Sequence, residues 1–121
     1  MIFRVKERNG RRIAVAEPGS VIIWDIPSAL DVLAEVSYNQ KSDRLILHRS
    51  NMSESFFDLS TRLAGDVLQK FVNYQMKVAI VGDFSGHVSQ SLRAFISESN
   101  RGSHVCFLPD EESALLWLSR P

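Results

Sequence analysis

The sequence predicts a mixed α/β fold with a mostly parallel sheet, an N-terminal β-hairpin and about four helices. Short apolar segments alternate with longer amphipathic segments along the chain, which is typical of strand–helix–strand crossovers in a parallel sheet. An Asn-Gly pair separates two alternating segments near the N-terminus, which indicates a hairpin. The length of 121 residues fits one α/β domain covering residues 1–121.

The first elements are predicted by alternation and by turn residues. Apolar and polar residues alternate over 2–6 and 12–16, and Asn9-Gly10 between them supplies the positive φ values of a two-residue turn. Pro18-Gly19 then breaks the chain. The apolar run 21–24 is too short for a helix and predicts a buried strand.

The remaining elements follow from helical spacing and short apolar runs. Apolar residues recur at helical spacing in segments 26–36, 58–75 and 88–100, and in a final helix that begins after Asp110. Strands are predicted between these helices, at 45–47, 77–81 and 104–108. The segment 52–57 can also form a short turn of helix. The predicted core includes Ile23, Leu33, Ile46, Leu63, Val67, Val78, Ile80, Phe95 and Phe107.

Gly65 lies inside the predicted helix 58–75. Glycine in a helix interior costs about 1 kcal/mol relative to alanine. We therefore expect a neighbouring element to approach the helix closely at this position.

Composition excludes several classes of protein. The chain has 14 basic and 14 acidic residues and is 45% hydrophobic, unlike a disordered tail, a collagen repeat or a strongly basic nucleic-acid binder. No segment approaches the roughly 20 apolar residues that span a bilayer, so we expect a soluble, cytoplasmic protein without membrane contact. The lone Cys106 lies in an apolar run and is expected to be a small buried hydrophobe.

Basic residues gather on the predicted hairpin, where Glu7 is the acidic exception. They are Arg4, Lys6, Arg8, Arg11 and Arg12. Such a stripe can follow a phosphate backbone, or it can protect an edge strand from pairing with other chains. The zero net charge of the chain favours the second interpretation, and we do not expect a nucleic-acid partner.

Polar residues follow the predicted strands at the sheet edge where ligands bind in open parallel sheets. They are Asp25, His48, Ser50, Asn51, Asp83, Ser85 and Asp110. The three aspartates could hold a metal ion with His48 as acid or base, giving a small-molecule or metal-dependent enzyme. Alternatively, each aspartate caps the helix that follows. We favour capping and predict no cofactor, no metal site and no catalytic residue. His48, His87 and His104 also lack metal-ligand spacing.

Two resemblances extend this interpretation. DLSTRLAGDVLQKFVNYQMKVAIVGDFS at 58–85, SLRAFISESNRG at 91–102 and ALDVLAEVSYN at 29–39 resemble a bacterial family of short single-domain proteins, a domain of unknown function. The element order resembles the STAS fold of anti-sigma-factor antagonists, which implies a STAS-like binding and regulatory module. In those proteins a phosphorylatable serine begins the helix after a central strand. Ser60, with Thr61 beside it, matches that position, although no glycine follows.

We therefore predict a non-enzymatic regulatory or protein-binding module that acts through helix 58–75 and the loop before it. A homodimer is expected because Phe56 and Phe57 are adjacent and cannot share one helical face, while Trp117 lies off the main stripe of its helix. Alternatively, the segment 52–57 folds back and buries both phenylalanines, with Trp117 packed against the sheet edge.

Overall fold

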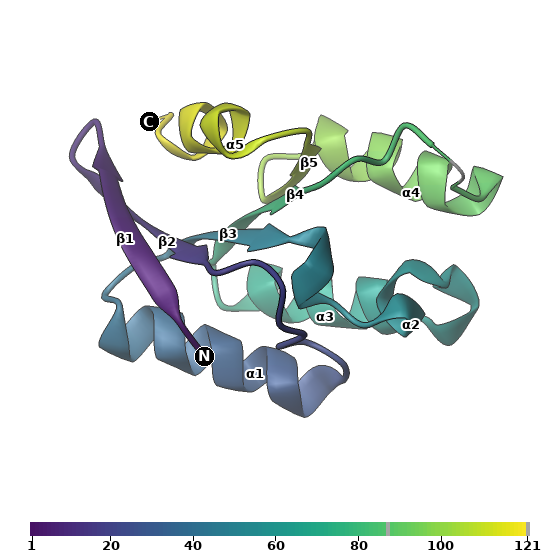
Figure 1. Ribbon diagram of the computed structural model, residues 1–121, viewed down its shortest axis with the longest axis horizontal. Helices are drawn as coiled ribbons and strands as arrows, with labels where there is room; N and C mark the ends of the chain where they lie inside the picture. Colours follow the sequence, from purple (N-terminus) through teal and green to yellow (C-terminus); the bar gives the residue numbers. More distant parts are fainter. Residues whose placement is uncertain (87, 121) are drawn as a thin grey trace.

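The computed structural model describes residues 1–86 and 88–120. Within them the strands form one sheet in the order β1-β2-β3-β4-β5 (Figure 1). The strands are β1 (Phe3–Arg8), β2 (Arg11–Ala16), β3 (Arg44–His48), β4 (Lys77–Val81) and β5 (Val105–Leu108). β1 pairs antiparallel with β2, and each later pair is parallel. The mixed, mostly parallel sheet with an N-terminal hairpin is confirmed.

The hairpin turn is the predicted two-residue turn. Arg8 pairs with Arg11 across it, so that Asn9 and Gly10 form the tip. Their φ angles are 54° and 76°. Positive φ at both positions matches the right-handed twist of the flanking strands, which explains the Asn-Gly pair.

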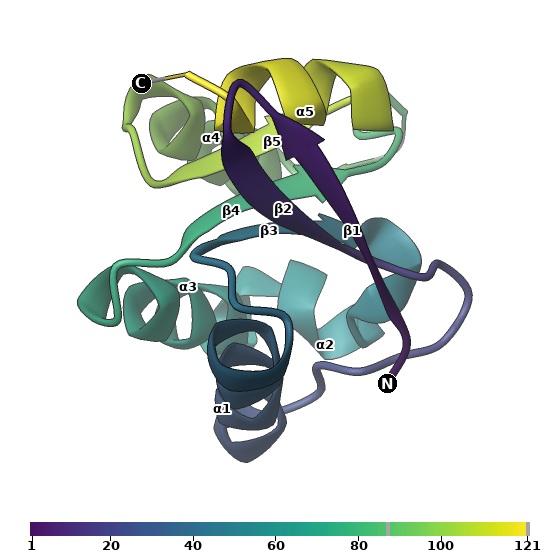
Figure 2. The same cartoon turned by 90° about the vertical axis from the view of Figure 1, so that its left-hand side faces the viewer.

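The helices cover both faces of the sheet. α1 (Ile26–Ala34) and α3 (Leu63–Asn73) lie on one side, and α5 (Glu111–Leu118) lies on the other (Figure 2). α4 (Gln90–Arg101) packs along β5 and contributes to the core shared with α1 and α3. A short α2 (Glu54–Phe57) precedes α3, so the described residues form five α-helices rather than about four.

The core is divided by the sheet into two apolar clusters. The larger cluster is enclosed by α1, α2, α3 and α4, and the smaller one lies under α5. Most of the predicted core residues are buried: Ile23, Leu33, Ile46, Val67, Val78, Ile80 and Phe107. Leu63 and Phe95 are only partly buried and pack against the edge of the larger cluster.

The segment 21–24 is not a strand of the sheet, so that prediction is wrong. It forms one isolated parallel bridge, between Ile23 and Met52. β2 and β3 are already hydrogen-bonded neighbours, which leaves no place between them for another strand. Instead, the Ile22 and Ile23 amides donate to the Asn51 carbonyl, and the Ile23 side chain fills the core.

The helix predicted over 58–75 begins later, at Leu63. A separate 3-10 turn, Leu59–Thr61, precedes it, and Arg62 between the two has φ 63°. This left-handed conformation is unusual for a residue with a Cβ atom and interrupts the helical hydrogen bonding. Ser60 therefore does not begin the long helix.

The expected close approach at Gly65 is also wrong. A Cβ atom added to Gly65 would meet nothing within 4 Å among the described residues. Gly65 is exposed on α3, and its presence there is not explained by packing inside this chain.

The two adjacent phenylalanines are buried within the chain. α2 directs Phe56 and Phe57 into the larger cluster, with their ring centroids 5.0 Å apart in an edge-to-face arrangement. Trp117 is partly buried against the smaller cluster under α5. The fold-back alternative therefore describes this segment, and the exposed apolar patch predicted from these residues is absent from the described part of the chain.

Among the described residues, no helix combines the length and the apolar character that crossing a membrane requires.

Candidate functional site

A groove of about 510 Å³ lies between the segment before α3 and the start of α4. We call it the Ser60 groove. It is lined by Arg49, Glu54, Phe57, Asp58, Leu59, Ser60, Val88, Ser89, Ser91 and Leu92. Ser60 is exposed at the groove, whereas Phe57 and Leu92 are buried beneath it.

Asp58 organises the turn that carries Ser60. Its Oδ1 atom accepts from the Ser60 amide at 3.1 Å and from the Ser60 hydroxyl at 2.7 Å. The hydroxyl bond and then the amide bond stabilise the carboxylate and lower the pKa of Asp58. The Thr61 hydroxyl lies 2.8 Å from the carbonyl oxygens of Ser55 and Asp58, to either of which it can donate. Thr61 therefore holds the turn together, while Ser60 faces the groove.

Arg49 is a groove residue that sequence reasoning missed. Its guanidinium lies 5.0 Å from the centroid of the Phe57 ring and 5.3 Å from that of the Phe84 ring, which are cation–π contacts. One of its N–H groups donates to the Asp83 carbonyl at 3.0 Å. A Cβ atom on Gly82 would approach the Arg49 Cβ to 2.9 Å, so this position requires glycine. Arg49 belongs to a polar run after β3 that is visible in the sequence. Its aromatic partners, Phe57 and Phe84, come from other segments of the chain.

His48 lies at the carboxyl end of β3 and faces α5. Its Nε2 atom is 2.9 Å from Glu111 Oε2, and an Arg4 guanidinium nitrogen is 3.2 Å from the same oxygen. Nδ1 of His48 is buried and has no hydrogen-bond partner among the described residues. Because the Glu111 carboxylate can only accept, the Nε2–H group of His48 is the donor in this contact.

Glu111 is the carboxylate at the centre of this cluster. Partial burial acts to raise its pKa, but the hydrogen bond from His48 and the charges of Arg4, His48 and Lys6 outweigh burial, so the pKa of Glu111 is lowered. His48 is therefore paired with an ionised carboxylate that also binds the hairpin.

Two of the three candidate aspartates are helix caps. Asp25 Oδ1 accepts from the Ser28 amide at 2.8 Å at the start of α1. Asp110 Oδ1 accepts from the Ser113 amide at 2.7 Å at the start of α5, and this backbone bond is the main cause of its lowered pKa. The capping interpretation is confirmed at both positions.

Asp83 does not cap a helix, and that part of the prediction is wrong. Its carboxylate accepts from the hydroxyl and the amide of Ser85, which lowers the pKa of Asp83 and closes a local turn. Ser89 caps α4 in its place, because its hydroxyl accepts from the Leu92 amide at 3.0 Å. Asp83 and Ser85 thus bind each other.

The described residues contain no group of three or more His, Cys, Asp or Glu side chains placed to hold a metal ion. His104 directly precedes β5, at the opposite end of the sheet from His48, and His87 lies outside the described residues. Cys106 is mostly buried, and burial raises the pKa of its thiol. Asp25, His48, Asp83 and Asp110 therefore form no metal-binding group in the part of the chain that the structure describes.

Asn51 is a structural residue. Its side chain is fully buried, its Oδ1 atom accepts from the His48 amide at 2.7 Å, and its Nδ2 atom donates to the carbonyls of Glu17 and Ser20. These bonds attach the 17–23 segment to the end of β3. Ser50 lies next to it, and its hydroxyl accepts from the Gly19 amide at 2.9 Å.

Three of the hairpin arginines face acidic or carbonyl groups of the chain itself. Arg4 contacts Glu17 and Glu111, and Arg8 contacts Glu112 at 2.9 Å. Arg12 donates to the Gln40 carbonyl. These contacts favour the interpretation of the hairpin as a charged, solvated edge.

Comparison with known proteins identifies the family of the chain. A comparison with curated proteins finds no match. The chain is similar to the crystal structure of a proposed anti-sigma factor antagonist from Thermotoga maritima, with 16% identity and a TM-score of 0.49, over 98% of this chain and 95% of that chain. The model of the family described as Domain of unknown function (DUF4180) matches residues 8–118. The chain therefore belongs to this family of unknown function, as its sequence predicts.

Proposed function

We propose that the chain is a non-enzymatic regulatory module that binds a protein partner through the Ser60 groove. The observation that carries this proposal is the groove itself, about 510 Å³ in volume, with Ser60 exposed beside it. Leu59 and Val88 supply apolar surface, while Ser60 and Ser89 supply hydroxyl groups. This mixture suits contact with another protein, because protein–protein interfaces combine apolar burial with a few directed hydrogen bonds.

Ser60 is the proposed regulatory residue. Its hydroxyl donates to Asp58 at 2.7 Å, and a phosphate on that oxygen would remove the proton and place about two negative charges beside the carboxylate. Repulsion from Asp58 would open the 3-10 turn and change the wall of the groove. This effect differs from the stabilisation expected at a helix start, because Arg62 separates Ser60 from α3.

The other candidate residues make contacts within the chain, which supports Ser60 as the residue that binds a partner. Asp25 and Asp110 satisfy helix termini, Asp83 closes a turn, and His48 is bound to Glu111. Each of these groups already makes contacts that stabilise the fold. Ser60 also donates to Asp58, but it is exposed at the groove beside Leu59, where a partner can reach it.

Site-specific photo-crosslinking combined with Ser60 variants tests the proposal. A photoreactive amino acid replaces Leu59 in the groove or, as a control, the exposed Leu116 on α5, and each protein is irradiated in extract of the source cells. We expect a partner that is captured from position 59 alone, retained by Ser60→Ala and lost by Ser60→Asp. Capture of the same proteins from both positions would contradict binding at the groove. Identical capture by Ser60→Ala and Ser60→Asp would remove the regulatory role.

Homodimer formation and a cytoplasmic location stay predictions. The phenylalanines that motivated the homodimer are buried within the chain, so the prediction now depends on solution measurements. Light scattering at micromolar concentrations decides it, since the monomer mass at every concentration contradicts a homodimer. Fractionation of the source cells tests the location.

A further inference from the structure

Exposed apolar side chains gather around α1. Among the described residues, the large hydrophobic side chains that remain most exposed are Met1, Ile2, Val21, Trp24, Leu30, Tyr38, Tyr74 and, apart from the others on α5, Leu116. The first four line one groove beside the start of α1, and the next three line another on its other flank. Concentrations of this kind mark interaction surfaces more often than scattered apolar residues do.

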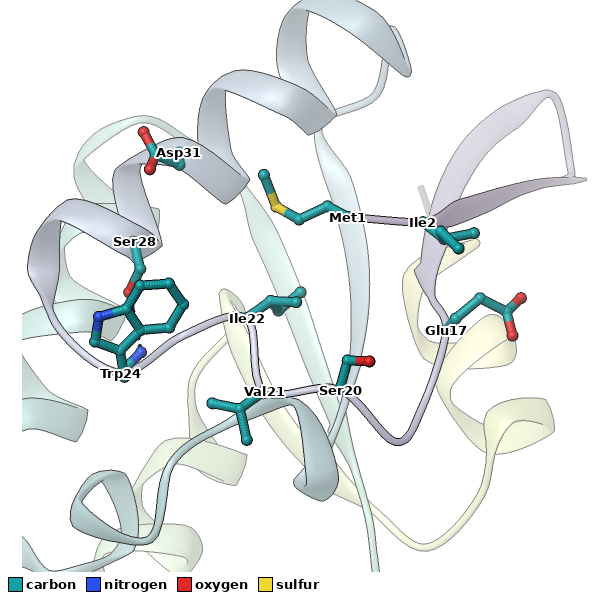
Figure 3. A pocket seen from close by; sticks show the side chains of 9 residues that line it. All are labelled: Met1, Ile2, Glu17, Ser20, Val21, Ile22, Trp24, Ser28 and Asp31. Atoms are coloured by element: carbon teal, nitrogen blue, oxygen red, sulfur yellow. Dashed lines mark hydrogen bonds between the residues drawn. The ribbon is translucent and has the colours of Figure 1, made fainter.

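The groove at the start of α1 has a volume of about 410 Å³, and we call it the Trp24 groove. Figure 3 shows Met1 and Ile2 across from α1, with Val21 and Ile22 along the connecting segment and Trp24 at the helix start. The side chain of Trp24 is 55% exposed, although a tryptophan at such a position can bury a large area. This indole is a suitable anchor for a partner, because tryptophan is enriched among the residues that dominate binding energy.

The ionisable side chains that line this groove are acidic. They are Glu17 and Asp31, and the lining contains no Lys or Arg among the described residues. Arg4 already pairs with Glu17 at 2.7 Å, whereas Asp31 is exposed and forms no ion pair within the described part of the chain. Met1 also lines the groove and carries the α-amino group, and the carboxylate that forms no ion pair beside the apolar wall is that of Asp31.

Asp31 is followed one helical turn later by Glu35, a second carboxylate on the same flank of the helix. Like charges at this spacing destabilise a helix slightly. Asn39 and Gln40 donate to Glu35, and these bonds lower its pKa, with a smaller contribution from the terminal amino group. α1 itself carries no basic residue to offset the pair. The α-amino group of Met1 offsets at most one of these two carboxylates, so a cation supplied by a partner would relieve the remaining repulsion.

We propose that the Trp24 groove is an interaction surface for a protein segment whose apolar side chains are flanked by Lys or Arg. The apolar wall accepts the hydrophobic side chains, and Asp31 receives the cation, so shape and charge favour the same partner. A second copy of this chain is disfavoured as occupant, since twofold pairing would bring like-charged helices together. The Trp24 groove shares no lining residue with the Ser60 groove, so this inference does not depend on the proposed function.

Fluorescence of Trp24 in the full chain provides the test. The Trp117→Phe substitution leaves Trp24 as the single tryptophan, and it also gives the background for the other variants. The probe is a synthetic amphipathic helical peptide of leucine and lysine, and its counterpart has glutamate at every lysine position. We expect the lysine peptide to shift Trp24 emission to shorter wavelength with saturation, and the affinity to fall as salt is added. The glutamate peptide should leave the emission unchanged.

Charge variants locate the site. Asp31→Asn should weaken binding of the lysine peptide and Asp31→Lys should weaken it further, by about tenfold, because an attractive contact becomes repulsive. Glu98→Lys, an equal charge change at an exposed position of α4, should leave the affinity unchanged. Circular dichroism and thermal unfolding confirm that each variant is folded.

Four results would overturn the proposal: no binding of the lysine peptide, equal binding of both peptides, no effect of Asp31→Lys, or an equal effect of Glu98→Lys. A concentration-dependent dimer that Trp24→Ser converts to monomer would also overturn it, because the occupant is then a second copy.

Discussion

The two faces of the sheet are stabilised in different ways. On the face covered by α1 and α3, a large cluster that includes Phe56, Phe71 and Met76 excludes water from the sheet. On the face covered by α5, the cluster is small, and ion pairs connect it to the hairpin. Burial gives the first face most of its stability, whereas the second face adds charge contacts that fix how α5 lies against β1 and β3.

The two proposed binding surfaces follow the same division. The Ser60 groove and the Trp24 groove both lie beside the larger cluster, where long connections between strands and helices leave side chains exposed. Buried side chains such as Ile23 and Phe57 attach these connections to the cluster. The α5 face uses its charged groups within the chain, through contacts such as Arg8 with Glu112.

The largest expected effect comes from the larger cluster. Phe71 is fully buried on α3, and Phe71→Ala should lower the free energy of unfolding by about 3–5 kcal/mol, through lost burial and the cavity left behind. Urea unfolding followed by far-UV circular dichroism measures this loss. A loss below about 1 kcal/mol would show that the cluster does not dominate stability.

Asn51→Ala should have the second-largest effect and lower the free energy of unfolding by about 3 kcal/mol. The substitution leaves the His48 amide and the Glu17 and Ser20 carbonyls without their buried partner, and each unsatisfied group costs about 1–3 kcal/mol, partly recovered by relaxation. The same unfolding experiment applies, with Ser50→Ala as the control, because Ser50 is exposed and accepts one bond. Equal losses from both substitutions would contradict the structural role of Asn51.

The elements that could be predicted from sequence are those whose signals are local. The two-residue turn at Asn9-Gly10 depends on the φ values of those residues, and the caps Asp25 and Asp110 depend on amides within the next turn. Strands β3, β4 and β5 were predicted because short apolar runs separated by helices fit a buried parallel sheet. Such signals are independent of the rest of the fold.

Other features could not be predicted, because two local signals compete for the same role or because the partners are distant in the sequence. The helical spacing of apolar residues continues past Arg62 and so does not reveal the break there. Arg62 adopts a left-handed conformation, which ends the 3-10 turn that Asp58 and Thr61 stabilise. Asp83 resembles a cap in sequence, yet Ser89 takes that role. The stacking of Arg49 between aromatic rings brings together three segments, and no pattern within any one of them indicates it.

A core substitution under α5 sharpens the comparison between the faces. Leu115 is buried, and Leu115→Ala should cost about 2 kcal/mol, at the low end for such substitutions, because the smaller cluster borders the partly exposed Leu108 and Trp117. With Trp24→Phe as background, Trp117 emission and far-UV circular dichroism should report the same urea midpoint if α5 unfolds with the sheet. If Leu115→Ala lowers the free energy of unfolding by more than Phe71→Ala does, the α5 face contributes more to stability than the opposite face, and the expected ranking of the two faces is wrong.

The smallest expected effect concerns the charge contacts of the α5 face. Because the pKa of Glu111 is lowered, its contribution to stability is fully present above the ordinary glutamate pKa of about 4.3 and is lost as pH falls through its value in the folded protein. Glu111→Gln should therefore lower the free energy of unfolding by about 1 kcal/mol or less at pH 7, since both the carboxylate and Arg4 are partly exposed to solvent.

The pH dependence distinguishes this charge effect from lost packing. The difference in unfolding free energy between the wild type and Glu111→Gln should shrink as the pH is lowered from 7 to 3, because the wild-type carboxyl becomes neutral like the amide. Glu98→Gln removes an exposed contact with Arg101 within α4 and should change stability little at any pH. If the Glu111→Gln difference is constant with pH, the side chain acts through shape, and the α5 face is stabilised by packing in the same way as the opposite face.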